Sequence, residues 1–66
     1  MKILLNGDRT ECADSCTVDE LVANCGLPPA STLIEHNGSA LHRREWSERK
    51  LAEDDRIEIL RVAAGG

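Results

Sequence analysis

The first hydrophobic run of the chain predicts a β-hairpin. Residues 2–5 form a short, mostly apolar segment that stops at Asn6-Gly7, the strongest short signal for a two-residue hairpin turn. A second strand over residues 10–13 would complete this hairpin. We therefore expect the chain to begin with two antiparallel strands.

The next stretch predicts one short helix. Thr17 is expected at the N-cap, and Glu20 stands three residues later, as a capping box requires. The apolar face at helical spacing comprises Val18, Leu21, Val22 and Cys25. Gly26 favours a helix end and Pro28-Pro29 prevents continuation, so the helix has only two or three turns.

Alternating hydrophobic and polar residues predict three further strands. These are expected over residues 32–36, 40–42 and 56–62. Residues 43–50 are polar apart from Trp46, which predicts a turn or a one-turn helix anchored by that side chain. A hairpin, one helix and then further strands is the order of an α+β fold, a mixed sheet with one main helix across a face.

The two terminal strands carry apolar residues on both faces. Ile3 and Ile57 alternate toward the helix, whereas Leu4, Leu60 and Val62 fall on the opposite parity. If the terminal strands are neighbours, Leu4 and Leu60 are expected side by side on the uncovered face. Such a cluster is a candidate partner surface, although isolated exposed leucines are common in soluble proteins.

Length and charge restrict the classes of function. The 66 residues are expected to form one domain, and the chain contains neither a bilayer-spanning apolar stretch nor a signal-peptide core. We therefore expect a soluble cytoplasmic protein that does not bind membranes. The net charge of −4 argues against nucleic-acid binding and weakly favours a partner with a basic docking surface.

The cysteines and histidines do not form a recognisable site in the sequence. An odd cysteine count without a signal peptide indicates reduced thiols, and the spacing of Cys12 and Cys16 lacks a zinc pattern, so no metal is expected. Cys25 is expected to be buried on the helix, with the other two around a loop. His36 and His42 are expected to be ordinary strand residues, because no nucleophile or buried carboxylate completes an acid–base site.

The C-terminal residues Ala63-Ala64-Gly65-Gly66 suggest a different kind of chemistry. None has a large side chain to anchor it, so residues 63–66 are expected to be mobile and to reach about 13 Å beyond the sheet. Glycine has no Cβ, which allows the backbone to enter a narrow channel. A carboxylate is a poor electrophile until it is activated, typically by adenylation, and such a protein is an acyl donor rather than a catalyst.

Several segments together carry a resemblance that covers essentially the whole chain. They are Lys2-Ile3-Leu4-Leu5-Asn6-Gly7, Thr17-Val18-Asp19-Glu20-Leu21, Asn37-Gly38, Arg43 before Glu45-Trp46, Asp55-Arg56-Ile57-Glu58-Ile59-Leu60 and Gly65-Gly66. This pattern resembles the thiamine-pathway sulfur-carrier proteins. The resemblance implies the ubiquitin-like β-grasp fold. His36, His42 and Asp54 depart from the family's usual residues, which leaves details of a strand and a turn open.

The resemblance also implies a reaction cycle on Gly66. A ubiquitin-activating-type adenylyltransferase uses ATP to adenylate the carboxylate, sulfur from a donor such as a cysteine desulfurase gives a thiocarboxylate, and thiazole synthase takes the sulfur. The carrier itself is then not an enzyme and binds no cofactor. The expected partner-binding residues are Gly65, Ala64, Ala63, Leu4, Leu60 and Val62.

Three alternatives remain open at this point. The molybdopterin-synthase small subunit shares the fold and the terminal chemistry but is usually somewhat longer. A ubiquitin-like modifier would join its last glycine to lysine in an isopeptide bond. A non-catalytic interaction domain would carry an inert tail.

Overall fold

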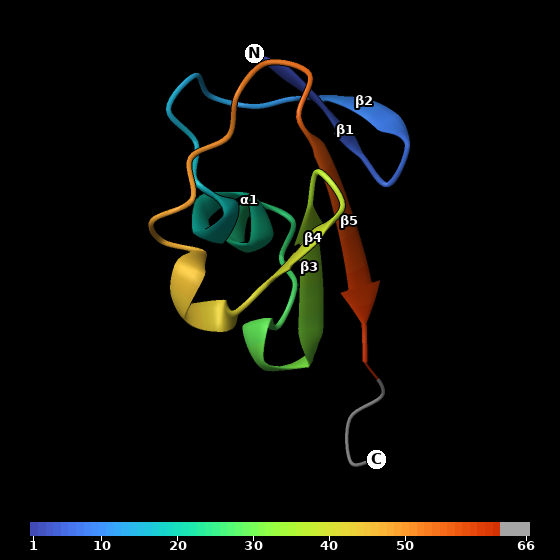
Figure 1. Cartoon of the computed structure of the whole chain (residues 1–66), viewed down its shortest axis with the longest axis vertical. Helices are drawn as coiled ribbons and strands as arrows, with labels where there is room; N and C mark the ends of the chain where they lie inside the picture. The colour runs from blue at the N-terminus through green and yellow to red at the C-terminus, as the bar shows by residue number, and fades with distance from the viewer. Residues whose placement is uncertain (63–66) are drawn as a thin grey trace.

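A mixed five-stranded sheet and one α-helix make up the computed structural model, which describes residues 1–62 (Figure 1). The elements are β1 (Lys2–Leu5), β2 (Asp8–Glu11), α1 (Val18–Asn24), the 3₁₀ turn η1 (Pro29–Ser31), β3 (Thr32–His36), β4 (Ser39–Leu41), the 3₁₀ turn η2 (Arg43–Glu45) and β5 (Arg56–Arg61). The strand order is β2-β1-β5-β3-β4. Only the β1–β5 pair is parallel among these strands; the other pairs are antiparallel. The expected α+β fold is confirmed.

The first hairpin forms where the sequence predicts it, but its second strand begins earlier than expected. Asn6 and Gly7 have φ angles of 49° and 86°, as a tight turn between twisted strands requires. This two-residue turn pairs Leu5 directly with Asp8. The second strand is therefore Asp8–Glu11, and the prediction of residues 10–13 is wrong at both ends.

Two other strands differ from their predicted ranges by one residue at a boundary. The second Asn-Gly turn pairs His36 directly with Ser39, so β4 begins and ends one residue earlier than the predicted 40–42. The last strand ends at Arg61 rather than at residue 62. The predicted one-turn helix within residues 43–50 is confirmed by η2.

The helix begins with the predicted capping box. The Glu20 backbone N–H donates to Thr17 Oγ1 at 3.3 Å, and the Thr17 N–H donates to Glu20 Oε1 at 3.0 Å. The prediction that Cys25 is buried is wrong, because α1 ends at Asn24 and Cys25 is its exposed C-cap residue. There the chain turns into Gly26, with a φ of 71°, and no longer follows the apolar face of the helix.

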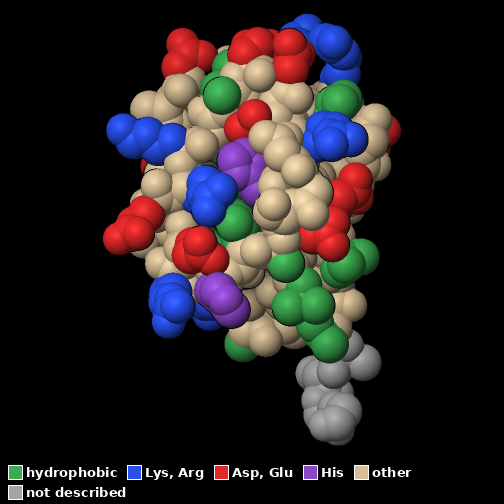
Figure 2. Space-filling view, in the orientation of Figure 1, with side chains coloured by type: hydrophobic (Ala, Val, Ile, Leu, Met, Phe, Trp, Pro, Cys, Tyr) green, Lys and Arg blue, Asp and Glu red, His purple; other side chains and the backbone are tan. Residues whose placement is uncertain are grey.

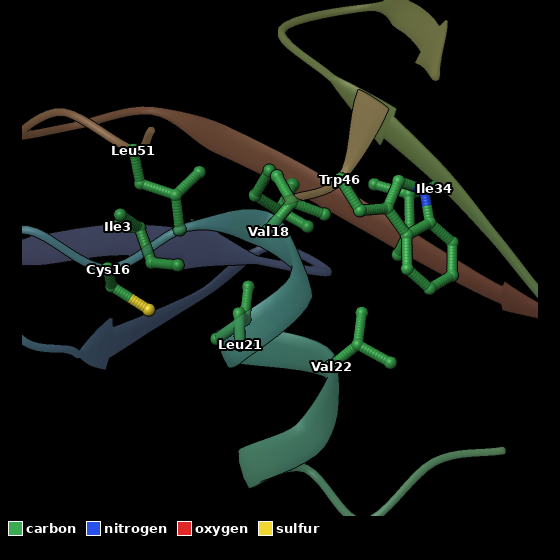
Figure 3. Close-up of a cluster of buried hydrophobic side chains, with 9 residues drawn as sticks. Ile3, Cys16, Val18, Leu21, Val22, Ile34, Trp46 and Leu51 are labelled. Carbon is green, nitrogen blue, oxygen red and sulfur yellow. The ribbon is translucent and has the colours of Figure 1, made fainter. Parts of the chain in front are cut away.

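The core lies between α1 and one face of the sheet (Figure 3). It comprises Ile3, Cys16, Val18, Leu21, Val22, Ile34, Trp46, Leu51 and Ile57. The segment after η2 closes this core against the helix, because the Val18 N–H donates to Arg49 O and the Asp19 N–H to Trp46 O. The predicted role of Trp46 as a core anchor is confirmed by its exposure of only 2%. Within residues 1–62, no helix is both long and apolar enough to cross a bilayer.

Candidate functional site

The last described strand holds the base of the C-terminal segment in the middle of the sheet. β5 pairs with β1 on one side and β3 on the other, and the Val62 N–H donates to Ser31 O at 2.8 Å. Gly66 follows Val62 by four residues, so its carboxylate lies within about 14 Å of Val62 at full extension. The predicted tail at residues 63–66, with the proposed roles of Ala63, Ala64, Gly65 and Gly66, lies outside the described residues.

An apolar patch lies on the uncovered face of the sheet at the C-terminal end of β5. Its members are Leu33, Leu60 and Val62, with exposed fractions of 56%, 54% and 47%. Leu33 and Leu60 are direct cross-strand partners between β3 and β5. Hydrophobic side chains gather above the grey C-terminal residues in Figure 2. Two of the predicted partner-binding residues, Leu60 and Val62, therefore lie together close to the start of the C-terminal segment.

Leu4 lies outside this patch. The strands β1 and β5 are neighbours, as expected, but Leu4 is aligned with Arg56, four positions before Leu60. At about 3.3 Å per residue, this places the two leucines roughly 13 Å apart along the sheet. The expectation that they lie side by side is wrong, because residue parity fixes the face of a strand but not its register.

Leu33 is the member of the patch that sequence reasoning missed. It falls on the opposite parity to Ile34, which is buried, so the same alternation applied to Leu4 and Leu60 would have placed Leu33 on the uncovered face. Its pairing with Leu60 depends on the β3–β5 register, for which the sequence carries no local signal.

A polar cluster joins β3 to the turn before β5. His36 is largely buried, and its Nε2 lies 2.7 Å from Asp55 Oδ2. Asp55 also accepts from the Ala52 backbone N–H at 2.8 Å and from Asn37 Nδ2 at 3.1 Å. His36 lies in a strand, as expected, but its contact with the half-buried carboxylate of Asp55 was not predicted. Because the cluster contains no nucleophile, we interpret it as a structural connection. The expectation that His42 is a strand residue is wrong, because β4 ends at Leu41 and His42 is exposed at the start of η2.

The Asp55 cluster gives the protein a defined acid sensitivity. Burial raises the pKa of Asp55, but hydrogen bonds from His36, the Ala52 N–H and Asn37 outweigh it and hold the pKa below its usual value. A carboxyl group whose folded pKa is depressed stabilises the fold above its unfolded pKa of about 3.9, and this contribution is lost as pH falls through the folded pKa.

We expect Asp55→Asn to lower the free energy of unfolding at neutral pH by about 1–3 kcal/mol, because His36, the Ala52 N–H and Asn37 lose a charged acceptor. Denaturant unfolding at a series of pH values checks this, and the difference from the parent should shrink below about pH 4. Asp54→Asn is the matched control, since Asp54 is exposed at a φ of 68° that asparagine also tolerates. Equal losses in the two variants would contradict the assignment.

The thiols of Cys12 and Cys16 are not activated as nucleophiles. Burial raises the pKa of both the Cys12 and Cys16 thiols, and a protonated thiol is a weak nucleophile. Cys12 is half-buried, Cys16 is buried and Cys25 is exposed. Within residues 1–62, no three His, Cys, Asp or Glu side chains gather in a way that would hold a metal ion.

Known proteins similar to this chain include a carrier of the same length, a solved structure of the same fold and part of a larger enzyme. The model of the ThiS family matches residues 3–66. The sulfur carrier protein ThiS of Escherichia coli is 30% identical over 66 residues, which are the full length of both chains. A thiazole synthase of Magnetococcus marinus is 32% identical over the same length, so this chain spans only 20% of that protein. The crystal structure of the thiamine biosynthesis protein ThiS from Geobacter metallireducens superposes over the whole of both chains with a TM-score of 0.84 and 28% identity. These matches confirm the ubiquitin-like β-grasp fold.

Proposed function

This chain belongs to the ThiS family and is a sulfur carrier of thiamine biosynthesis, and we propose that the C-terminal carboxylate of Gly66 is the group that carries the sulfur. The observation that supports this role is the family match, which extends through both terminal glycines to residue 66. Two of the three thiols are poor competitors for this role, because burial raises the pKa of Cys12 and Cys16.

The proposed chemistry is a nucleophilic acyl substitution in two steps. A carboxylate oxygen of Gly66 attacks the α-phosphorus of ATP in a ubiquitin-activating-type adenylyltransferase, which forms an acyl adenylate and releases pyrophosphate. A sulfur nucleophile then attacks the acyl carbon and displaces AMP. With hydrogen sulfide as the nucleophile, the products are a thiocarboxylate, AMP and a proton. In the cell, a cysteine desulfurase or a related donor supplies this sulfur, and thiazole synthase consumes it.

The folded body is proposed to position the reactive end. Leu60 and Val62 contact the partner enzymes, and Ala63, Ala64 and Gly65 pass through the channel that leads to the reaction centre. The length of residues 63–66 restricts that centre to within about 14 Å of Val62. Leu4 contacts a separate part of the partner surface, because it lies away from the apolar patch.

Mass spectrometry tests the proposed chemistry directly. Incubation with ATP and the adenylyltransferase from the same organism should add one adenylyl group, the mass of AMP less one water, to the intact chain. After addition of sulfide, the product should be about 16 mass units heavier than the starting protein, the difference between sulfur and oxygen. Fragmentation should place both changes at Gly66, and a reaction without ATP is the control. An unchanged mass in the complete reaction would refute the proposal.

A further inference from the structure

Two glutamates face each other across the middle of the uncovered sheet face. Glu35 on β3 is the direct antiparallel partner of Glu58 on β5. Both alternate with residues on the core face, since Ile34 and Ile57 are buried, so both carboxylates belong to the face opposite α1. Side chains in such positions have Cβ atoms about 5 Å apart, and like charges there destabilise a sheet.

Neither carboxylate of this pair forms an ion pair within residues 1–62. The described ion pairs involve the N-terminal amine, His36 with Asp55, and Arg49 with Glu45. Arg56 stands two positions from Glu58 on the same face, yet it forms no ion pair with either glutamate across residues 1–62. Since like charges directly opposite each other destabilise a sheet, a cation from another molecule would relieve this pair.

The carboxylate pair and the apolar patch form one continuous surface. Along β3 and β5, the cross-strand pair of Glu35 and Glu58 is followed on the same face by that of Leu33 and Leu60. In Figure 2, acidic side chains border the hydrophobic ones above the C-terminal end. An apolar centre with a charged border is typical of specific protein interfaces, in which the apolar part gives affinity and the charges select the partner.

One enzyme is indicated as the occupant of this surface. The Magnetococcus marinus relative is named a thiazole synthase, and a segment that matches the whole of this chain makes up 20% of it. A segment joined to an enzyme in one polypeptide meets that enzyme at high effective concentration. When the carrier and the enzyme are separate polypeptides, a docking surface has to bring them together instead.

We propose that thiazole synthase docks on this uncovered face. The enzyme would contribute an apolar patch bordered by a Lys or Arg, and Glu35 and Glu58 would select that basic side chain. The inference rests on the proposed function, because it names the partner that takes sulfur from the Gly66 thiocarboxylate. It assigns to the glutamates a role in recognition that is separate from the terminal chemistry. The pair then costs the free chain stability and favours the complex.

Calorimetric titration of the full chain with thiazole synthase from the same organism tests the proposal. At about 50 mM salt, the double variant E35Q/E58Q should bind about tenfold more weakly than the parent, as expected for a lost charge pair across an interface. Between about 50 and about 300 mM salt, the parent should lose affinity and the double variant should change little, because salt screens charge pairs. Leu60→Ala should weaken binding yet keep the salt dependence of the parent.

A matched control removes two negative charges from the other side of the sheet. Asp19 and Glu48 are exposed near α1 and η2, and D19N/E48Q should bind like the parent at both salt concentrations. The free E35Q/E58Q variant should unfold at the same temperature as the parent or higher, because a repulsive pair has been removed. Weaker binding then does not reflect loss of the fold.

The outcomes separate this inference from the proposed function. Parent-like binding by E35Q/E58Q, an equal loss in D19N/E48Q, or no binding of the parent would overturn the docking assignment. So would a result in which E35Q/E58Q binds the adenylyltransferase more weakly than the parent does but binds thiazole synthase normally. In each case the mass change at Gly66 in the parent still tests the carrier chemistry independently. Absence of that mass change would refute the proposed function whatever the glutamate variants do.

Discussion

Deletion of Gly66 is expected to abolish sulfur transfer while leaving the free energy of unfolding unchanged. The deletion moves the terminal carboxylate back along the chain by about 3.5 Å. Misplacement of reacting groups by about 1 Å already costs on the order of 100-fold in rate, so the loss should be at least that large. All buried hydrophobic residues of the described structure lie between Ile3 and Ile57, which is why the core should not change.

Two measurements check this prediction on the same samples. Thiazole formation in a reconstituted reaction reports sulfur transfer, and thermal unfolding followed by circular dichroism reports the fold. Glu48→Gln is the control, because it changes an exposed side chain outside the C-terminal segment and preserves the terminal carboxylate. A shortened chain that still supports thiazole formation at the parent rate would show that Gly66 is not the carrier group.

Truncation of Trp46 is expected to have the largest effect on stability. The indole is 2% exposed and belongs to the cluster between α1 and the sheet (Figure 3). Trp46→Ala should lower the free energy of unfolding by about 3–5 kcal/mol, through lost apolar burial and the cavity that remains. Small domains often have little more stability than this, so the variant should be largely unfolded.

The Trp46→Phe variant distinguishes packing from polar interactions at this position. Within residues 1–62, the buried indole Nε1 has no hydrogen-bond partner, so the change removes no bond found there and keeps an aromatic ring. We expect a loss of only about 1–2 kcal/mol, as for a change of side-chain shape in a packed core. The guanidinium of Arg43, with its Cζ 5.2 Å from the ring centroid, would still lie over an aromatic face. Chemical denaturation checks both variants, and equal losses would contradict a packing role.

Features controlled by neighbouring residues were predicted from the sequence. The capping box depends only on Thr17 and Glu20, and the first hairpin turn only on Asn6 and Gly7, so local chemistry identifies both. Trp46 was also identified, because a lone large apolar side chain in a polar segment has few alternatives to burial.

Features that depend on distant alignment were not predicted. The β1–β5 register separates Leu4 from Leu60, and the β3–β5 register brings Leu33 beside Leu60. The same applies to His36 and Asp55, which are 19 residues apart. The role of Gly66 came from a pattern spread over the chain and not from its local geometry, which lies outside the described residues.

The central place of β5 has a mechanical consequence if, as proposed, partner enzymes bind the C-terminal residues. Tension applied beyond Val62 would load a strand bonded to neighbours on both sides, and the Asn6 side chain adds bonds to the Ile59 N–H at 2.7 Å and the Ile59 carbonyl at 3.3 Å. An edge strand would peel away one bond at a time, whereas this strand must shear against two neighbours together. An enzyme that binds and releases the C-terminus can therefore apply force to it without unfolding β5.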